Sequence, residues 1–406
     1  MSEEIFALDI GTRKVMGLIA CKKGDTVQVL DAQVMEHLSR PMFDGQIHSI
    51  EEVAKTVKCV KESLESRLGR KLTQAAVAVA GRNLVTYKTK VVKELDTEKE
   101  ITEEIIKGLE LEAVDKIFSD AGGDIAQYYC VGYSPVYFEL EGNRITSLLG
   151  HRAKSITVEM IATFLPRVVL DSMFAVLKRT GLEATGITLE PIAAIQAIIP
   201  PEMRNLNIVL VDIGAGTSDL ALTKDGYVFS YGMVPDAGDE ITEYISEIML
   251  TDFNGAEQIK RKLEILEEIE YEDIWSKRWQ VKTADIKQNL LAAVHKLSES
   301  IAKKGLELNG AAPAAVVAVG GGSLTAGLMP ELAKSFGMSE DKAGIRLPLA
   351  IKNLKDMTGK LTGPEAVTPI GIALMAVNAQ GLRFVDIEIN GRKIRMLDFQ
   401  QKKDIL

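Results

Sequence analysis

Apolar residues gather into three short runs, and each run ends at a turn that contains glycine. The runs with their turns cover residues 5–12, 208–217 and 315–323. Short runs rich in β-branched residues and bounded by glycine predict buried strands. The first two runs both continue into Asp-Ile-Gly, at Asp9 and Asp212, which lie half a chain apart. This repeat predicts two halves built on related plans.

Stretches with helical spacing alternate with these strands. Residues 49–68 place apolar side chains along one stripe, and residues 168–180 read as a helix that stops at Gly181, a residue type that commonly follows a helix. Residues 255–308 are mostly charged, and we expect them to form one or two long helices on an outer face. The alternation of strands and helices predicts an α/β fold.

The pattern changes between about residue 84 and residue 164. Alternating residues at 85–92 predict a strand, and residues 103–118 have helical spacing. We interpret 84–164 as a small α+β unit inserted into the first half. Tyrosines gather in this unit, and their side chains suit both a core and an interface. Because no phosphate-binding motif falls inside it, we expect the unit to contact neighbouring molecules rather than take part in catalysis.

Composition narrows the function classes. The chain has 406 residues with 48 basic and 57 acidic side chains, a net charge of −9, and no block of Lys or Arg, which argues against nucleic acid as the main partner. The three cysteines lie far apart, so no disulfide framework is expected and a reducing cytosol is favoured. No signal peptide is expected, and no apolar stretch reaches the roughly 18 residues that span a membrane.

Two loops of the sequence suit phosphate binding. A strand that ends in Asp-x-Gly-Thr places backbone N–H groups and a hydroxyl around phosphate oxygens, as at Asp9–Thr12 and, with two residues more, at Asp212–Thr217. The Asp at the strand end can hold a hydrated Mg²⁺, which binds through few carboxylates and several waters. Asp9 alone could be an ordinary turn residue. The two loops together favour a site that grips a triphosphate from both sides.

Three further places offer candidates, each with a structural alternative. Glu190 stands just before a helix, where it either complements the helix dipole or orients a water at a terminal phosphate. Glu257 and Lys260 lie three apart on one helical face, as a surface ion pair or as ligand contacts. The glycines at 320–322 form either a tight turn or a close approach for a flat ligand such as adenine.

In this order, the motifs resemble the phosphate and adenosine motifs of the actin-like ATPase superfamily, which includes actin, DnaK-type chaperones, MreB, PilM and FtsA. Residues 7–15 are particularly similar to the opening of the FtsA cell-division proteins. Other segments resemble the connecting motif, the loop after the second phosphate motif, the ribose-contacting helix and the closing helix of the family: 189–194, 238–242, 256–260 and 369–373. The likeness runs through nearly the whole chain.

The resemblance implies two RNase H-like domains that close on ATP and Mg²⁺, with a small inserted subdomain as in FtsA. It implies that Asp9 and Asp212 hold the hydrated magnesium, that Glu190 orients the attacking water, and that Glu190 and Asp212 are the catalytic residues. The other residues implied to bind the nucleotide are Gly11, Thr12, Lys14, Gly214, Ala215, Gly216, Thr217, Gly238, Glu257, Lys260, Gly321, Gly322 and Ser323. The expected units are 1–83 with 165–195 as the first actin-like domain, 84–164 as the insert, 196–380 as the second domain and 381–406 as a tail.

Two features depart from the family pattern. Ala215 stands where the family usually has a third glycine, and its Cβ must avoid the phosphates, so we expect slow hydrolysis at most. FtsA proteins normally end in an amphipathic membrane-targeting helix. Here the alternating residues on both sides of Asn390-Gly391 instead predict a β-hairpin, which suggests the start of a further domain. Residues 400–406 are basic and mildly apolar, and they leave a membrane helix as the less favoured alternative.

The expected function is that of an ATP-binding, actin-like scaffold of the FtsA type in bacterial cell division. The resemblance implies self-assembly as a dimer or filament, recruitment of partners such as the tubulin-like FtsZ, and a cytoplasmic location at the inner face of the membrane. A PilM-like assembly factor for a pilus or secretion system is the first alternative. A chaperone or sugar-kinase-like ATPase is the second, although the chain leaves too little room for a peptide-binding domain and offers no identifiable sugar-binding carboxylate.

Overall fold

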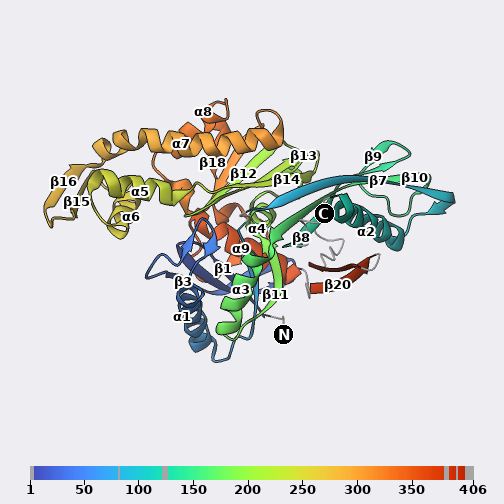
Figure 1. Cartoon of the computed structure of the whole chain (residues 1–406), viewed down its shortest axis with the longest axis horizontal. Coiled ribbons are helices and arrows are strands. Elements are labelled where there is room, and N and C mark those ends of the chain that lie inside the picture. The colour runs from blue at the N-terminus through green and yellow to red at the C-terminus, as the bar shows by residue number, and fades with distance from the viewer. Residues whose placement is uncertain (1–3, 81–82, 121–126, 379–383, 390–391, 398–406) are drawn as a thin grey trace.

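The computed structural model describes residues 4–80, 83–120, 127–378, 384–389 and 392–397. Two lobes, each built on a mixed β-sheet between helices, form the centre of the molecule (Figure 1). A third sheet extends from one side of this centre and a small hairpin from the other, at opposite ends of the long axis (Figure 1).

The first lobe contains a six-stranded sheet in the order β11-β6-β1-β2-β3-β19. β1, β2 and β3 are antiparallel neighbours, while β6 and β11 continue the sheet in parallel. Its strands are β1 (Glu4–Ile10), β2 (Lys14–Lys23), β3 (Thr26–Glu36), β6 (Gln74–Val79), β11 (Glu183–Leu189) and β19 (Leu354–Asp356). The two-stranded ribbon β4 (Met42–Phe43) and β5 (Gln46–Ile47) follows β3.

The second lobe repeats this plan in the order β14-β13-β12-β17-β18. β12, β13 and β14 are antiparallel neighbours, and β17 and β18 continue in parallel, so β12 corresponds to β1. The strands are β12 (Ile208–Ile213), β13 (Ser218–Lys224), β14 (Tyr227–Val234), β17 (Ala315–Val319) and β18 (Ala343–Ile345). The predicted α/β fold with two related halves is therefore confirmed.

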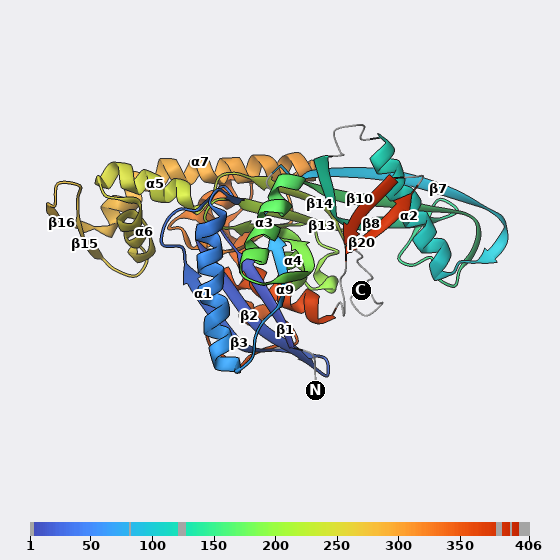
Figure 2. The same cartoon turned by 60° about the horizontal axis from the view of Figure 1, so that its bottom comes forward.

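Helices of the first lobe follow the predicted pattern. α1 (Ile50–Leu68) starts at Ser49, whose hydroxyl accepts a hydrogen bond from the backbone N–H of Glu52 at 3.4 Å. It ends at Gly69, whose φ of 68° lies in the left-handed region that glycine adopts without strain. α3 (Arg167–Arg179) ends just before Gly181. α1 and α3 pack against each other on the first lobe (Figure 2).

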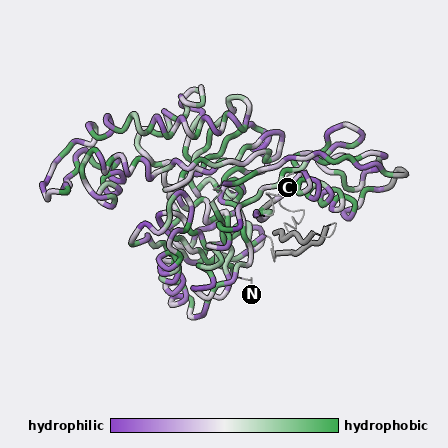
Figure 3. Tube along the Cα trace, in the orientation of Figure 1, coloured by the Kyte–Doolittle hydropathy of each residue, from purple (hydrophilic) through white to green (hydrophobic). Residues whose placement is uncertain are grey.

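The outer helices of the second lobe are α5 (Gly238–Met249), α6 (Phe253–Lys262), α7 (Thr283–Asn309) and α8 (Leu328–Ser335). α7 contacts β13 and β14, α8 contacts β18, and α5 packs on α6 and α7 towards the end that carries the small hairpin (Figure 1). Figure 3 shows hydrophilic and hydrophobic residues alternating along α7, whose apolar side packs into the core of this lobe. For residues 255–308 we expected one or two long helices. The structure has two helices, α6 and α7, with a hairpin between them that was not expected, β15 (Glu268–Glu272) and β16 (Arg278–Lys282).

Two helices cross between the lobes. α4 (Glu190–Ile198) follows the first sheet but contacts β12 and β13, and α9 (Val367–Asn378) follows the second sheet but contacts β1 and β2. They pack so closely that a Cβ added at Gly371 would lie 2.0 Å from the carbonyl oxygen of Ala193. β19 also pairs with β3. β19 and α9, which fall in the expected second domain of 196–380, thus contact the sheet of the first lobe.

Residues 85–166 form the third sheet with one helix on it. The strands β8 (Tyr128–Leu140), β10 (Arg152–Pro166) and β7 (Val85–Glu100) are antiparallel neighbours, β9 (Asn143–Ile145) pairs with β8, and α2 (Glu103–Asp120) contacts β7 and β10. The helix predicted at 103–118 is α2. Tyr87 packs edge-on against Phe164, with ring centroids 5.7 Å apart. Part of the tyrosine cluster thus contributes to packing within this unit.

The hairpin predicted for the tail is present as β20 (Phe384–Ile389) and β21 (Arg392–Leu397), and β21 pairs with β8 of the third sheet. Residues 400–406 of the expected tail lie outside the described residues. Short 3₁₀ helices complete the structure: η2 (Pro201–Met203), η3 (Gly321–Leu324), η4 (Glu340–Lys342), η5 (Pro348–Ala350) and η6 (Pro364–Ala366). Within the described part of the chain, every helix is too short or too polar to cross a bilayer.

Candidate functional site

A pocket of about 490 Å³ lies between the two lobes. It brings together fourteen of the sixteen residues singled out from the sequence: Asp9, Gly11, Thr12, Lys14, Glu190, Asp212, Gly214, Ala215, Thr217, Gly238, Glu257, Lys260, Gly321 and Gly322. Residues from all three glycine loops therefore meet at one site. Of the described residues of the inserted unit, none lines this pocket.

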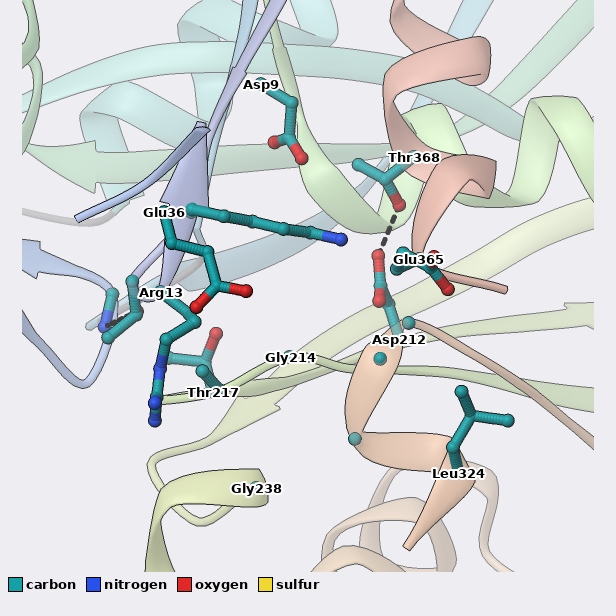
Figure 4. A pocket seen from close by; sticks show the side chains of 18 of the residues that line it. Asp9, Arg13, Glu36, Asp212, Gly214, Thr217, Gly238, Leu324, Glu365 and Thr368 are labelled. Carbon is teal, nitrogen blue, oxygen red and sulfur yellow. Dashed lines mark hydrogen bonds between the residues drawn. The ribbon is translucent and has the colours of Figure 1, made fainter. Parts of the chain in front are cut away.

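The β1–β2 loop and the β12–β13 loop have the same backbone geometry. In the first, the N–H of Gly11 donates to the carbonyl oxygen of Lys14 at 3.0 Å; in the second, the N–H of Gly214 donates to that of Thr217 at 2.8 Å. Each loop thus closes a four-residue turn between antiparallel strands. The turns carry their Asp residues into the pocket from opposite lobes (Figure 4).

The pocket holds two carboxylates that resist ionisation. Burial, together with the nearby charge of Asp212, raises the pKa of Asp9 to about 7, although Lys14 opposes the shift. Burial raises the pKa of Asp212 to about 6 against the opposing effects of the Thr368 hydroxyl and Lys14. Two buried carboxylates with raised pKa values are unfavourable in their ionised form, and a bound cation would stabilise that form.

The positive charge of Lys14 acts on both of these carboxylates. Its ammonium group is largely buried, which lowers its pKa, while Glu365, Asp9 and Glu36 favour the charged form. A buried ammonium group among carboxylates suits an anionic ligand, because such a ligand would share the cation that the carboxylates now surround.

Glu190 lies at the N-terminus of α4, as expected, in the wall of the pocket. Burial and the charges of Asp219, Asp9 and Asp212 raise its pKa well above the usual range. The hydroxyl of Thr217 donates to Asp219 at 3.0 Å, which ties the second loop to this acidic group. Burial and nearby negative charge thus favour the neutral form of this carboxyl group, and a cation bound nearby would favour its ionised form.

Glu257 and Lys260 share a face of α6 and form an ion pair of 2.8 Å. Burial alone would raise the pKa of Glu257, but Lys260, Arg13 and the hydroxyl of Thr242 outweigh it and hold the pKa at about 2. Glu257 is therefore an ionised carboxylate, able only to accept hydrogen bonds. Lys260 also donates to the carbonyl oxygen of Gly238 at 2.7 Å, which links α6 to the first residue of α5.

The third glycine loop packs directly on the second. Gly320 has a φ of 80°, and a Cβ there would lie 2.3 Å from Oδ1 of Asp212. A Cβ at Gly322 would lie 2.6 Å from the carbonyl oxygen of Gly214. Glycine at these two positions is thus required by close packing of one loop on another, in addition to any ligand.

Two of the expected residues do not line the pocket. Gly216 faces the first lobe, where a Cβ would lie 2.9 Å from the hydroxyl oxygen of Thr12 and from the backbone nitrogen of Asp44. Ser323 is buried, and its hydroxyl donates to the carbonyl oxygen of Gly320 at 2.7 Å. Both residues pack within or between the loops, and their contact with a ligand stays a prediction.

The structure adds residues that the motifs did not single out. Thr368, at the start of α9, donates its hydroxyl to Asp212 (Figure 4). Glu365 lies beside it, and its Oε2 is buried without a hydrogen-bond partner. Both residues lie just before the closing-helix motif at 369–373. This position in the sequence is the signal that could have pointed to them.

His37 supports the first loop from behind. Its Nε2 lies 3.2 Å from the carbonyl oxygen of Gly11, which can only accept, and its Nδ1 lies 2.9 Å from the hydroxyl oxygen of Thr56. Nε2 therefore carries the proton of the neutral ring. Burial lowers the pKa of His37, so the ring stays neutral at physiological pH and holds the loop in one orientation.

The donor set fits a hydrated cation better than a directly coordinated one. Among the described residues there is no group of three or more His, Cys, Asp or Glu side chains arranged to hold a metal ion. Mg²⁺ usually keeps several of its waters and binds through one or two carboxylates with ligand phosphates. Asp9 and Asp212, facing each other across the pocket, provide such a pair.

Comparison with solved structures defines the class of fold. The chain superimposes on the "PilM-PilN type IV pilus biogenesis complex" with a TM-score of 0.63 and 17% sequence identity, over 93% of this chain and 99% of that chain. It also matches the ethanolamine utilization protein EutJ from Carboxydothermus hydrogenoformans with a TM-score of 0.51 and 16% identity, over 92% and 90% of the chains. The fold is that of the actin-like ATPases, as the motif order predicted.

The sequence comparisons point to one family, cell division protein FtsA. The family model for cell division protein FtsA matches residues 209–371. The chain is 27% identical to cell division protein FtsA of Bacillus subtilis over 267 residues, which are 64% of this chain and 58% of that relative. It is 22% identical to the FtsA of Streptococcus pneumoniae over 380 residues, 87% of this chain and 80% of that relative. The predicted resemblance to FtsA-type proteins is confirmed, and the chain spans less than two thirds of the length of the Bacillus relative.

Proposed function

We propose that this chain is an ATP-binding, actin-like scaffold of the FtsA type that acts in bacterial cell division. The observation that carries the proposal is the pair of equivalent loops, which present Asp9 and Asp212 from separate lobes to one pocket. The names of its sequence relatives support the assignment to cell division. The confirmed fold supports nucleotide as the ligand class.

In this proposal the chain's own residues bind and orient MgATP. The N–H groups and hydroxyls of the two loops hold the phosphates, Lys14 neutralises part of their charge, and Asp9 and Asp212 hold waters of the cation. The Mg²⁺ ion, when bound, would screen the charge of the terminal phosphates. Glu190 would accept a hydrogen bond from the attacking water, and Glu257 would accept from ribose hydroxyls.

Assembly and location are the more distant parts of the proposal. We infer that the protein self-assembles as a dimer or filament and recruits division proteins, with the tubulin-like FtsZ as a candidate partner. It would work in the cytoplasm at the inner face of the membrane through peripheral or indirect contact. Its role is then mainly to bind, with hydrolysis slower than the roughly 10 s⁻¹ of a typical enzyme.

Isothermal titration calorimetry with MgATP tests the binding step. The parent should bind, Asp212→Ala should bind at least about tenfold more weakly, and Glu190→Gln should bind within about twofold of the parent while hydrolysing more slowly, because a water-orienting group acts mainly in the transition state. Equal affinity of the parent and Asp212→Ala would remove Asp212 from the site. Turnover comparable to a metabolic kinase would contradict the scaffold role.

A PilM-like assembly factor is the second candidate. The specific observation in its favour is the superposition on 99% of the chain from the pilus biogenesis complex. The two candidates differ in partner, so filament formation with ATP on lipid favours the first, whereas co-purification with pilus or secretion components from the native cell favours the second.

A further inference from the structure

Three ion pairs and one aromatic ring join the two lobes beside the pocket. The first lobe provides Arg13, Glu36 and Arg40, and the second provides Asp239, Glu243, Phe253 and Arg261. We call these seven residues the interlobe clasp. The three pairs link positions more than 200 residues apart in sequence, and each has one member on α5 or α6.

The central contact of the clasp joins Arg13 to Asp239. Nη2 of Arg13 lies 2.5 Å from Oδ1 of Asp239, and the two side chains are only 16% and 9% exposed. The same nitrogen lies 3.7 Å from Oε2 of Glu257. An ion pair this well shielded from water is screened less by salt and is stronger than an exposed pair.

Phe253 fixes the two arginines of the first lobe. The guanidinium carbon of Arg40 lies 3.9 Å from the centre of its ring, and that of Arg13 lies 4.6 Å from it. Both distances are within the range of cation–π attraction. Because Phe253 is the first residue of α6, the ring couples both arginines to the helix that carries Glu257.

Two outer pairs extend the contact. Arg40 donates to Glu243 at 2.7 Å and lies 3.6 Å from Asp239, and Arg261 donates to Glu36 at 2.7 Å. Arg261 also donates to Glu257 at 2.8 Å. The exposure of these side chains makes each outer pair weaker than the central one.

The clasp and the helix crossing stand on different sides of the pocket. Arg13 and Glu36 of the clasp appear on one side in Figure 4, and Thr368 at the start of α9 appears on the other. The lobes are thus joined by the closely packed helices α4 and α9 on one side and by ion pairs on the other. Packed helices resist separation, whereas ion pairs exchange with water and salt.

We propose that the interlobe clasp is a latch that holds the two lobes closed beside the pocket, so that nucleotide enters and leaves only when the latch opens. This inference rests on the proposed function for the identity of the ligand. The latch shares Glu257 with the expected ribose contacts, because both Arg13 and Arg261 reach that carboxylate. Opening the latch and loosening the ribose contact are therefore one event, and the latch sets the rate of nucleotide exchange.

The first test needs no nucleotide. One spin label is attached to Cys59, the exposed native cysteine on α1, and the other to a Glu299→Cys substitution on α7; the two other cysteines are buried. Double electron–electron resonance then measures the distance between the lobes. Asp239→Ala should broaden the distance distribution toward longer values, and the matched control Asp31→Ala, which breaks an Arg67 pair of 2.7 Å within the first lobe, should leave it unchanged.

The second test measures exchange in the same proteins. A fluorescent ATP analogue bound with Mg²⁺ is chased with excess ATP in a stopped-flow instrument. Asp239→Ala should accelerate dissociation by at least about tenfold, which corresponds to about 1.4 kcal/mol. Glu243→Ala, which removes only an exposed outer pair with Arg40, should accelerate it by a smaller factor.

The outcomes separate the two proposals. A parent that binds no nucleotide overturns the proposed function, while the spin-label distances still decide whether the clasp holds the lobes. Unchanged distances in Asp239→Ala overturn the latch, and so does a dissociation rate equal to that of the parent or of Asp31→Ala. Longer distances with faster dissociation support it.

Discussion

At the residue scale, Asp212 has competing roles in stability and in the proposed binding of a cation. Burial keeps its pKa near 6 in the folded chain, above the ordinary Asp value of 3.8. The folded state therefore binds the proton more tightly than the unfolded state, and the ionised carboxylate destabilises the fold as the pH rises through this window. The same negative charge is what a hydrated cation would need.

Asp212→Asn should consequently stabilise the protein in the absence of ligand. At pH 7.5 we expect the midpoint of thermal unfolding to rise by about 2–4 °C, because the amide keeps an oxygen for the Thr368 hydroxyl without the cost of the charge. The difference should shrink as the pH falls from 6 towards 4, where the parent becomes protonated. Differential scanning calorimetry at pH 7.5 and 4.5 measures this, and a midpoint difference that does not depend on pH would contradict it.

The residues that the sequence revealed are those whose signal is local. Asp9 and Asp212 each follow an apolar run and precede a glycine, and a strand-to-strand turn of this kind needs only neighbouring residues to form. Thr368 and Arg13 were not found as partners, because Thr368 meets Asp212 across 156 positions and Arg13 meets Asp239 across 226. Which side chain of a distant element points at a loop depends on the packing of whole elements.

At the element scale, the crossing of α4 and α9 depends on the absence of a side chain at Gly371. A Cβ there would lie 2.0 Å from the carbonyl oxygen of Ala193, which belongs to the backbone of α4 and has no rotamer to change. Gly371→Ala should therefore destabilise the protein by about 1–3 kcal/mol or prevent its folding, despite the helix propensity that alanine adds. Urea unfolding followed by circular dichroism measures the loss. Gly108→Ala in α2, where a Cβ would meet nothing within 4 Å, is the control, and equal effects of the two changes would refute this account.

The β15–β16 hairpin is an element that helical spacing concealed. Its turn is built on Asp273, which accepts hydrogen bonds from the N–H groups of Trp275 and Lys277 and from Nε1 of Trp279, at 2.9, 3.0 and 2.8 Å. This turn is specified by one carboxylate in a charged stretch, which carries no periodic signal. Helical spacing therefore assigned the hairpin residues to the long helices expected over 255–308.

Asp273→Ala should loosen this hairpin without affecting the lobes. The chain has two tryptophans, Trp275 and Trp279, and both lie in the hairpin, so intrinsic fluorescence selected for tryptophan reports on it alone. The bond from Trp279 lowers the pKa of Asp273, so acidification below the usual Asp range should weaken the turn in the parent as the substitution does at neutral pH. We expect a shift of the emission of Trp279 to longer wavelength. An unchanged spectrum would show that other contacts hold the turn.

At the scale of the whole molecule, the third sheet is attached to both lobes. Val131 and Leu165 pack into the core of the first lobe, while Arg144 lies 3.5 Å from Asp225 of the second lobe. Lys88 lies over the ring of Phe229 in β14, at 5.2 Å. A movement of one lobe against the other must therefore shift this sheet as well, although it contributes no described residue to the pocket.

Shortening the inserted sheet tests its expected role in contacts with neighbours. Replacement of Thr89–Met160 by Asn-Gly would join Lys88 to Ile161, which are paired in the antiparallel ladder, through a two-residue turn. We expect MgATP affinity within about twofold of the parent, and loss of ATP-dependent assembly in sedimentation experiments. Circular dichroism and calorimetry establish that the shortened chain is folded. A folded, shortened chain that still sediments with ATP would remove assembly from the functions of this unit.

Because α4 and α9 each pack on the sheet of the other lobe, the chain should not separate into two independently stable fragments. A chain cut near residue 200 would give two pieces, each with a sheet of its own and a helix that covers the other sheet. Each piece alone would expose the apolar surface that its partner's helix normally covers, so both should aggregate separately and reconstitute the protein when made together. Each half thus supplies part of the other's core, so we expect neither to fold stably without its counterpart.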